Sequence, residues 1–343
     1  MTAAMTMQAA LCHRYGPPEA IHLARIPRPR PRRGEVLIKV QAAGVTTGDA
    51  RIRGAQVPEG MGPLIRLIFG LRGPRRPVLG REFAGTIVEH GAGAPAALVG
   101  SLPPGTAVFG ITPGIRMGTH ADYLCMPAKG LLLPRPPEMS LETAAAFFFG
   151  GLTAADFLLD QCALQPGERV LVVGATGAVG AAAVQIARAH GARVTALAST
   201  ANLDLARALG AQEVLDYRAG TLRGEWDVIL DIPGVLDDGQ RHLARGGRLA
   251  LITATLRQTL AANLRPGGAR RAGVTRETHG AMTRLLELYQ TGAYQPLIGT
   301  ALPFTRIIEA HALASSGHKR GNVVVLMQPP AEAPAPEDEQ LRN

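Results

Sequence analysis

The stretch RVLVVGATGAVGAAAVQIARAHG (169–191) decides the fold of this chain. An apolar run enters a turn with glycines at 174, 177 and 180, and alanine-rich residues with helical spacing follow. A second apolar run, RVTALAS (193–199), comes next. A strand, a glycine turn, a helix and another strand in this order predict a dinucleotide-binding βαβ unit. A tight turn that binds nothing is the alternative.

The residues of this turn are the expected phosphate contacts. The first glycine position of the dinucleotide fingerprint is an alanine here, so the motif is Ala-x-Gly-x-x-Gly. Gly177 lets the backbone approach a pyrophosphate, and Gly180 lets the helix pack closely on the strand. Unpaired N–H groups at the start of the helix then face the phosphates. The predicted contacts are Ala175, Thr176, Gly177, Ala178, Val179 and Gly180.

The end of the second strand selects between NADH and NADPH. An NAD-specific site places an acid there to bind the ribose hydroxyls, but this sequence has Ser199, Thr200 and Asn202. Hydroxyl and amide groups donate hydrogen bonds to a 2′-phosphate. Tyr217 and Arg218, after the third strand, are expected to close over the same phosphate. The sequence therefore favours NADPH.

The periodicity of the apolar residues changes along the chain. Residues 8–133 show short alternating runs broken by Gly and Pro, which is typical of a β-rich domain. Residues 140–164 have a helical pattern, with Ser140 as the N-cap and a bend expected at the Gly150–Gly151 pair. After residue 166, apolar strands alternate with helices, which indicates a parallel sheet covered on both faces.

The predicted fold class is α/β, with a β-rich domain and a Rossmann doubly wound parallel-sheet domain. Helices are also predicted at 235–244 and 280–292, whereas residues 254–279 give no clear pattern. The tail is acidic and rich in Pro and Ala, so we expect disorder there. The expected boundaries are 1–139, 140–292, 293–328 and a tail at 329–343.

The formal charge of +9 is carried almost entirely by arginine. Two stretches, 25–35 and 64–77, are basic, but they lack the interleaved aromatic residues of single-strand nucleic-acid binders. We therefore expect solvated basic faces and no nucleic-acid partner. The positive field is expected to draw a phosphorylated cofactor toward the protein.

The cysteines and the apolar segments bear on the cellular location. Cys12, Cys125 and Cys162 are far apart and form no Cys-x-x-Cys pair, so we expect reduced thiols rather than disulfides or a zinc ribbon. No apolar stretch reaches the roughly 18 residues of a membrane span. The start of the chain lacks the pattern of a secretion signal. The expected location is the cytoplasm, with no stable membrane insertion.

Several segments together resemble the medium-chain dehydrogenase/reductase superfamily, and within it the zinc-free quinone oxidoreductase (zeta-crystallin-like) branch. The resemblance runs from about Met7 to Met327. Besides the glycine turn, it rests on YGPPEAIHL (15–23), PRRGEVLIKVQAAGV (31–45), GREFAGTIVEHG (80–91), FGGLTA (149–154), LGAQEVLDY (209–217) and SSGHKRGNVVV (315–325). It implies a GroES-like substrate domain, an inserted dinucleotide-binding domain, and final strands that return to the first domain. It also implies an active site between the domains and a homodimer or homotetramer.

The sequence departs from the family at several positions. Zinc-dependent relatives carry Cys at the position of Thr46 and His at that of Arg81, so no catalytic metal is expected here. Quinone reductases often carry Asn at position 46 and Tyr at the position of Arg51, which leaves the substrate open. The Lys residues that relatives have at the positions of Asn202 and Asn322 are also missing, which weakens the case for NADPH.

The resemblance places positions 46 and 81 where a metal would otherwise face the substrate. The Thr46 hydroxyl and the Arg81 guanidinium are then candidate donors to an oxygen that gains charge as hydride is transferred. The alternative for Arg81 is an ion pair with Glu82, Asp49 or another carboxylate that only holds the loop. Asp49 is expected to orient a backbone turn. Arg51 either points at the substrate or is exposed.

The remaining expected contacts surround the nicotinamide half of the cofactor. Thr153 resembles a residue whose hydroxyl approaches the nicotinamide in relatives. The turn after the strand at 226–232, which starts at Ile232, and Thr253 after the next strand lie at carboxyl ends of parallel strands, where ribose and nicotinamide bind. Arg320 is a candidate contact of the cofactor phosphate, and the alternative is that its side chain makes no such contact.

These features predict an NADPH-dependent, zinc-independent oxidoreductase that transfers hydride to quinones or α,β-unsaturated carbonyls. The alternatives are a metal-free NADP-dependent alcohol/carbonyl oxidoreductase and a non-catalytic NADPH-binding sensor. The insertion at 54–77 contains an apolar run with basic flanks. It is interpreted as a lid over an apolar substrate, with a packing element or a membrane-surface contact as alternatives.

Overall fold

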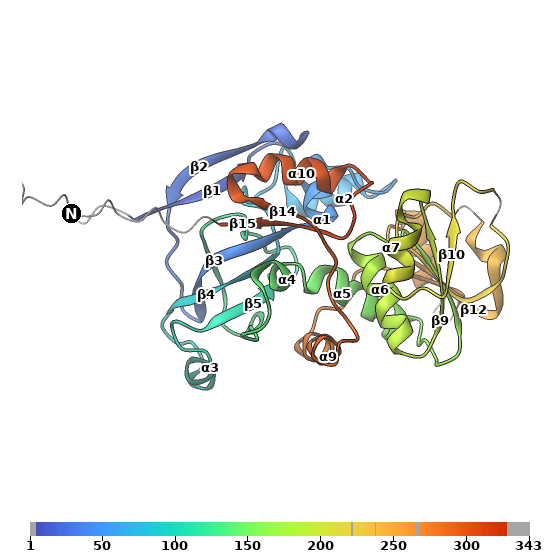
Figure 1. Ribbon diagram of the computed structural model, residues 1–343. Helices are drawn as coiled ribbons and strands as arrows, with labels where there is room; N and C mark the ends of the chain where they lie inside the picture. Colours follow the sequence, from blue (N-terminus) through green and yellow to red (C-terminus); the bar gives the residue numbers. More distant parts are fainter. Residues whose placement is uncertain (1–4, 221, 237, 265–267, 328–343) are drawn as a thin grey trace, which may run out of the picture.

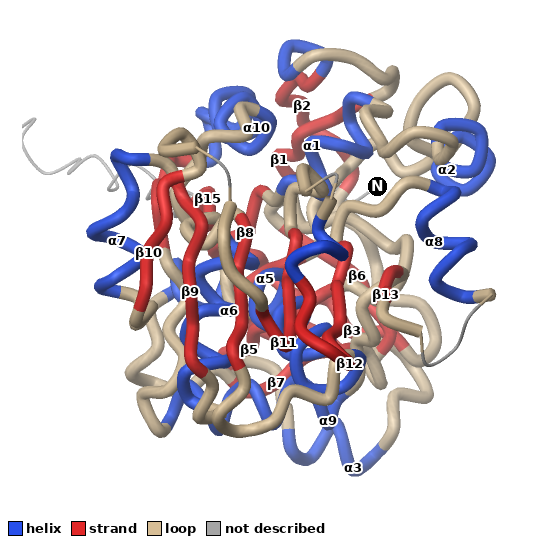
Figure 2. Tube along the Cα trace, turned by 90° about the vertical axis from the view of Figure 1, so that its right-hand side faces the viewer, coloured by secondary structure: helices blue, strands red, loops and turns tan. Residues whose placement is uncertain are grey.

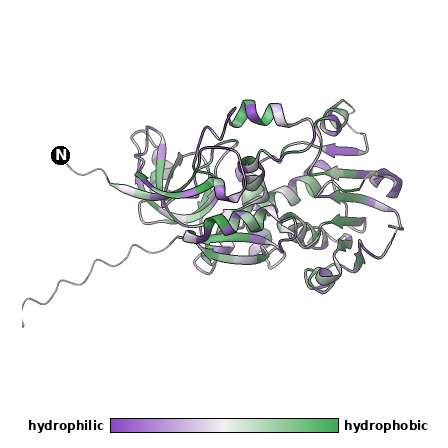
Figure 3. Cartoon of the chain, turned by 90° about the horizontal axis from the view of Figure 1, so that it is seen from above, coloured by the Kyte–Doolittle hydropathy of each residue, from purple (hydrophilic) through white to green (hydrophobic). Residues whose placement is uncertain are grey.

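The computed structural model describes residues 5–220, 222–236, 238–264 and 268–327, which form two lobes, each built on a β-sheet (Figure 1). Figure 3 shows the same lobes from above. The segment that contains α5 (Phe148–Ala155) runs between them.

The second lobe contains a six-stranded parallel sheet with the order β10-β9-β8-β11-β12-β13, whose strands are side by side in Figure 2. This is the strand order of a dinucleotide-binding fold, and the direction of winding reverses between β8 and β11. The predicted α/β class is therefore confirmed. The strands are β8 (Arg169–Val173), β9 (Arg193–Ala198), β10 (Glu213–Asp216), β11 (Trp226–Asp231), β12 (Leu243–Leu251) and β13 (Arg270–Ala272).

The central strands of this sheet are buried on both faces, which explains their continuous apolar sequences. In β8, Val170, Leu171 and Val172 have no exposed surface. Helix α6 (Ala178–Ala189) packs on β8 and β9, and α7 (Leu203–Ala208) packs on β9 and β10. The helix predicted after the glycine turn is confirmed.

The first lobe contains a seven-stranded sheet with the order β14-β15-β3-β4-β5-β7, and β6 pairs with β3. Two C-terminal strands lie in this sheet, because β15 pairs with β3 and β14 pairs with β15. The strands are β3 (Glu35–Val45), β4 (Glu82–His90), β5 (Ala107–Ile111), β6 (Tyr123–Pro127), β7 (Leu131–Pro134), β14 (Ile298–Pro303) and β15 (Asn322–Leu326). A separate hairpin is formed by β1 (Thr6–Cys12) and β2 (Ile21–Pro27).

The remaining α-helices of this lobe complete its outer surface. They are α1 (Thr47–Gly54), α2 (Gly62–Phe69), α3 (Ala96–Ser101) and α10 (Ile307–Ser315). Helix α10 packs against α1 and β15, so the C-terminal part of the chain supports the same layer as the N-terminal part.

The helical segment between the lobes is broken at a different place from the one predicted. Ser140 caps α4 (Leu141–Ala145), as expected, by accepting a hydrogen bond from the Thr143 N–H at 3.1 Å. The break falls after α4, and the Gly150–Gly151 pair lies inside α5. A Cβ on Gly150 would lie 2.6 Å from the Ala178 carbonyl oxygen. The pair therefore serves close helix packing rather than a bend.

The helix predicted at 235–244 was wrong, because only a 3-10 turn, Gly239–His242, forms there. The backbone N–H groups at the start of this range are hydrogen-bonded to a side chain that precedes it. The buried Asp231 carboxylate accepts hydrogen bonds from the N–H groups of Gly234, Val235 and Leu236 at 2.9–3.2 Å. These contacts hold a turn and prevent a helix from starting.

Three later predictions have different outcomes. The helix predicted at 280–292 is confirmed as α9 (His279–Gln290). The segment without a clear pattern contains α8 (Leu256–Asn263) and β13. The predicted disorder of 329–343 falls outside the described residues.

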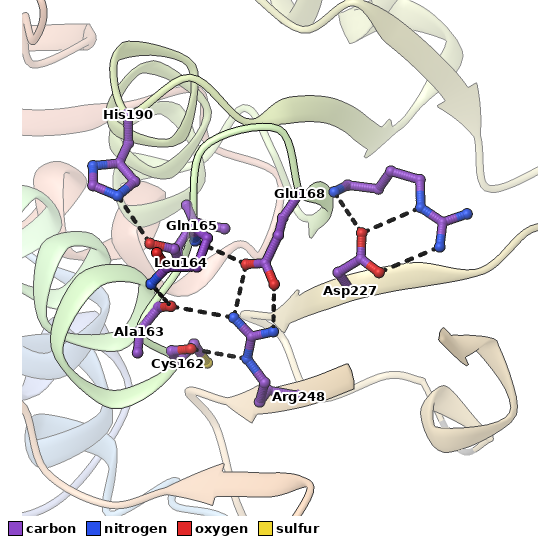
Figure 4. A network of polar contacts seen from close by, with 9 residues as sticks. Cys162, Ala163, Leu164, Gln165, Glu168, His190, Asp227 and Arg248 are labelled. Atoms are coloured by element: carbon purple, nitrogen blue, oxygen red, sulfur yellow. Dashed lines mark hydrogen bonds and ion pairs between the residues drawn. The ribbon is translucent and has the colours of Figure 1, made fainter. Parts of the chain in front are cut away.

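Ion pairs fasten the amino ends of the parallel strands, on the edge opposite the glycine turn (Figure 4). Arg248 of β12 donates to both Glu168 carboxylate oxygens, at 2.7 and 2.8 Å. Arg248 also donates to the Cys162 carbonyl oxygen at 2.8 Å. The guanidinium lowers the pKa of Glu168. This edge holds strands and helices together and leaves the carboxyl edge for binding.

Candidate active site

The glycine turn between β8 and α6 has the shape of an open cradle. Gly177 is the N-cap of α6, and a Cβ on it would have only the Gly174 carbonyl oxygen within 4 Å, at 3.6 Å. Gly180 has no such space, because a Cβ there would lie 2.1 Å from the same oxygen. Ala178 and Val179 begin the helix beside this open space. The turn therefore fits a phosphate group on one side and close packing on the other.

A segment from the first lobe lies directly on this turn. The Gly321 N–H donates to the Thr176 carbonyl oxygen at 2.8 Å, and Gly321 and Gly177 form a parallel β-bridge. The neighbouring Arg320 donates to Asn202 Oδ1 at 2.7 Å and to the Ala201 carbonyl oxygen at 2.8 Å. The structure thus brings together residues that are more than a hundred positions apart in the sequence.

The loop after β9 holds the residues predicted to bind the 2′-phosphate. Asn202 Nδ2 donates to Ser199 Oγ at 3.0 Å, which aligns both side chains next to Arg320. Thr200 donates from its hydroxyl to the exposed carboxylate of Asp216, at the end of β10. The sequence argument missed this acid, because it looked for a carboxylate only after the second strand and considered only Tyr217 and Arg218 after the third. Its signal was the DY pair at the end of the third strand.

Tyr217 and Arg218 follow that acid in the chain. Tyr217 is half exposed, and the Arg218 guanidinium lies 5.6 Å from the centre of its ring. The backbone of Tyr217 is next to the end of β9, because the Tyr217 N–H donates to the Ala198 carbonyl oxygen at 3.2 Å. Their closing over a phosphate stays a prediction.

The turns after β11 and β12 touch each other. A Cβ on Gly234 would lie 2.5 Å from the Thr253 carbonyl oxygen, and Gly234 adopts a positive φ of 75°. Ile232 and Thr253 therefore lie on adjacent turns at the carboxyl edge of the sheet. Thr153, on α5, is buried, donates to the Phe149 carbonyl oxygen at 2.7 Å and lies 3.3 Å from the Thr275 hydroxyl.

Thr46 is the N-cap of α1 and is paired with Asp49. The Thr46 hydroxyl donates to Asp49 Oδ2 at 2.7 Å, and the Asp49 N–H donates back to that hydroxyl at 3.1 Å. This capping box orients a backbone turn, which is what was expected of Asp49. Because the Thr46 hydroxyl donates its proton to the hydrogen bond with Asp49, it can only accept a hydrogen bond from a ligand. Its predicted role as a donor therefore requires the hydroxyl to rotate.

Arg81 forms the ion pair that was its alternative role. Its Nη2 lies 2.6 Å from Glu277 Oε2 and donates to the Thr112 carbonyl oxygen at 2.7 Å. Glu277 precedes α9, so this pair joins the two domains. However, the buried Arg81 Nε–H makes no hydrogen bond among the described residues. One donor of this guanidinium is therefore free, and its catalytic role stays a prediction.

Glu82 is a fully buried carboxylate beside these residues. Its Oε1 accepts hydrogen bonds from the N–H groups of Phe148 and Phe149, at 2.6 and 2.7 Å, at the start of α5. Burial raises the pKa of Glu82 to about 8, and the nearby Asp49 carboxylate adds to the effect, although the two N–H bonds oppose it. Sequence reasoning treated Glu82 only as a partner for Arg81 and missed its contact with the helix.

We expect Glu82→Gln to remove a pH dependence of stability. In the folded protein Glu82 keeps its proton up to about pH 8, whereas in the unfolded chain it loses it near its ordinary value of 4.5. Wild-type stability should therefore fall as the pH rises between these values. Urea unfolding at pH 5 and 8 should show the variant gaining on the wild type at the higher pH. The exposed Glu138→Gln is the control, and equal slopes in E82Q and wild type would contradict the assignment.

Family models match both lobes of the chain. An alcohol dehydrogenase GroES-like domain matches residues 32–137, and a zinc-binding dehydrogenase domain matches residues 209–325. An NAD(P)H oxidoreductase of Drosophila melanogaster, described as mitochondrial, is 28% identical over 92% of this chain and 85% of its own length. The chain belongs to the medium-chain dehydrogenase/reductase superfamily.

Two further similar proteins are named for reductase or oxidoreductase activities. A trans-enoyl reductase of Aspergillus terreus is 35% identical over 211 residues, 60% of this chain, and the match spans only 56% of that enzyme. A quinone oxidoreductase from Coxiella burnetii has the same fold, with a TM-score of 0.83, 23% identity, and coverage of 94% of this chain and 100% of that one. These relatives are oxidoreductases, and the superfamily to which the chain belongs binds a nicotinamide cofactor.

The insertion at 54–77 contacts the cofactor domain of this medium-chain dehydrogenase/reductase. The Leu256 N–H, at the start of α8, donates to the Glu59 carbonyl oxygen at 3.1 Å, and both segments line an open pocket of about 890 Å³. Leu64, Leu67 and Leu71 are exposed on and after α2. Among the described residues, no helix is both long and apolar enough to span a bilayer. The lid, packing and membrane-surface interpretations all stay open.

Proposed function

We propose that this chain is an NADPH-dependent, zinc-independent reductase of quinones or α,β-unsaturated carbonyls. The observation that carries the proposal is the contact of Arg320 with Asn202 and Ala201. It supports a positive charge at the end of β9, where a 2′-phosphate distinguishes NADPH from NADH. The open cradle at Gly177 supports a pyrophosphate next to it.

The nicotinamide cofactor supplies the hydride. In the proposed site, the chain aligns the reactants and stabilises charge on the substrate oxygen. In the proposal, Thr153 and the turns that contain Ile232 and Thr253 contact the nicotinamide and its ribose. Arg81 offers its free Nε–H to the substrate oxygen while Glu277 holds the guanidinium in place.

Zinc independence is part of the proposal. Thr46 and Arg81 stand where zinc-dependent relatives carry thiolate and imidazole ligands, and neither side chain suits zinc. Among the described residues, no three His, Cys, Asp or Glu side chains are placed to hold a metal ion. Activity that survives exhaustive dialysis against a chelator would support this part, and activity restored only by added zinc would overturn it.

The function is tested by NADPH consumption with a quinone, an enone, a simple ketone and an aldehyde, each run in parallel with NADH. Turnover of the quinone or the enone with a preference for NADPH supports the proposal. Turnover of the ketone alone would replace it with the alcohol/carbonyl oxidoreductase. Tight NADPH binding without turnover of any acceptor would identify a sensor.

We expect Ser199→Asp to shift the preference toward NADH. A carboxylate at the end of β9 repels the 2′-phosphate and accepts hydrogen bonds from the ribose hydroxyls. The ratio of kcat/KM for NADPH to that for NADH should fall at least about tenfold, which corresponds to about 1.4 kcal/mol. Ser199→Asn, which has the same size without the charge, is the control. An unchanged ratio in S199D would show that other residues read the phosphate.

We also propose a cytoplasmic location and a homodimer or homotetramer, and neither follows from the proposed reaction. Light scattering on the purified protein tests the assembly, and a monomer mass would overturn it.

A further inference from the structure

Arg51 lies on α1 of the substrate domain and reaches across to the cofactor domain. Its Nη2 donates to Thr253 Oγ1 at 3.1 Å. Thr253 follows β12 at the carboxyl edge of the parallel sheet, next to the turn after β11. The side chain of Arg51 is partly buried. The guanidinium therefore lies at the domain boundary where the proposed function places the nicotinamide and the substrate.

Arg51 has no acidic partner, although it is partly buried. Among the described residues no ion pair includes it, whereas Arg81 is held by Glu277. Burial lowers the pKa of Arg51, and no nearby carboxylate opposes this effect. A guanidinium carries five N–H donors, and the Thr253 hydroxyl takes one. A cation without a counter-anion in such a place is suited to an anionic group from outside the protein.

We propose that Arg51 is a catalytic residue that binds the substrate oxygen on which negative charge develops. The inference rests on the proposed function and adds to it a specific contact. It also names a substrate class: a conjugated carbonyl or quinone with an oxygen that reaches the domain boundary. Of the two possibilities open for Arg51 in the sequence, the contact with Thr253 favours the one that points toward the substrate.

The chemistry of the proposed step balances. Hydride from NADPH forms a C–H bond at the β-carbon of an enone, and NADPH becomes NADP⁺. The electron pair of the C=C bond moves to the adjoining C–C bond, and the carbonyl π pair moves to oxygen. Arg51 stabilises this oxyanion by hydrogen bonds until a proton from water reaches the α-carbon and the carbonyl re-forms.

Arg51→Met keeps much of the volume of the side chain and removes the charge. We expect kcat with an enone to fall about 100- to 1,000-fold, as for the loss of an oxyanion donor. Arg51→Lys should recover part of this loss, because it keeps the positive charge. The NADPH dissociation constant, measured by fluorescence, should stay within about threefold of the wild-type value. The exposed Arg245→Met, at the other end of β12, controls for net charge.

A binding measurement separates contact with an oxyanion from structural support. The probe is 4-nitrophenol, titrated with the NADP⁺ complex, because its phenolate absorbs visible light. The pKa of the bound phenol should lie at least about one unit lower in wild type than in R51M. Arg51→Lys, which keeps the positive charge, should retain part of this shift, whereas a residue that only braces the two domains would leave the pKa of the bound phenol unchanged in both variants.

The outcomes are distinct. If the bound phenol has the same pKa in R51M as in the wild type, Arg51 only braces the two domains and the proposal is overturned. A rise in KM with unchanged kcat in R51M would also overturn it, because that pattern is uniform binding. Wild-type protein that binds no NADPH would instead disprove the proposed function, on which this inference rests.

Discussion

Gly177→Asp is expected to abolish NADPH binding while leaving the fold intact. The nearest atom to a Cβ at this position lies 3.6 Å away, so the side chain has room. Its carboxylate would occupy the space in which the cradle at the start of α6 is expected to hold a pyrophosphate. Like charges in contact cost several kcal/mol, so the affinity should fall at least about 100-fold, or about 3 kcal/mol.

Calorimetric titration with NADPH measures this loss, and the urea midpoint without cofactor shows that the protein is folded. Gly177→Asn has the same shape without the charge and is the matched control. It should lose markedly less affinity than G177D. If G177D bound NADPH as tightly as the wild type, the phosphates would have to lie elsewhere, and the proposed function would fail with them.

Gly180→Ala is expected to lower the stability of the protein even without any ligand, whereas Gly177→Asp should affect only ligand binding. A Cβ there would lie 2.1 Å from the Gly174 carbonyl oxygen and 2.7 Å from the Ala175 Cα. These are backbone atoms and cannot turn away as a flexible side chain does. The start of α6 must move off β8, and we expect a loss of about 3 kcal/mol in the free energy of unfolding.

The matched control is Gly280→Ala, which also lies in the first turn of a twelve-residue helix, α9. A Cβ at Gly280 has only the Thr278 hydroxyl nearby, at 4.0 Å, so alanine should be tolerated or slightly stabilising, by up to about 1 kcal/mol. Urea unfolding of both variants at one pH tests the pair. Equal stability of G180A and G280A would contradict the packing described for the glycine turn.

The local parts of the fold were predictable because their causes lie within short segments. The glycine turn, α6 and α9 follow from apolar spacing and from residues that cap or interrupt a helix. The predicted helix at 235–244 failed because its pattern competes with the buried Asp231 side chain, which holds the backbone N–H groups before it. Likewise, the sequence predicted a bend at Gly150. The structure shows instead that a side chain there would collide with the Ala178 backbone, so glycine is required for close helix packing.

The candidate site was predictable only in part. The contacts that join distant segments carry no local signal: Arg320 with Asn202, and Arg81 with Glu277. Such contacts depend on how two separately folded sheets meet. For Thr46, the sequence indicated a donor to the substrate oxygen, whereas the capping box with Asp49 is a short-range feature that its spacing of three residues already allowed.

By itself, the sequence determined the α/β class and the order of strand, glycine turn and helix, because these follow from periodicity and from backbone positions that only glycine or alanine fits. The superfamily was indicated by the resemblance of several segments to its members. The tertiary structure decided which charges meet. It gave Arg81 an acidic partner and left Arg51 without one among the residues described. It also buried Glu82 at the start of α5 and placed Arg320 against the β9 loop. The physical reason is that the energy of a charge depends on its burial and on its neighbours in space, and neither is encoded in the residues adjacent to it in the chain.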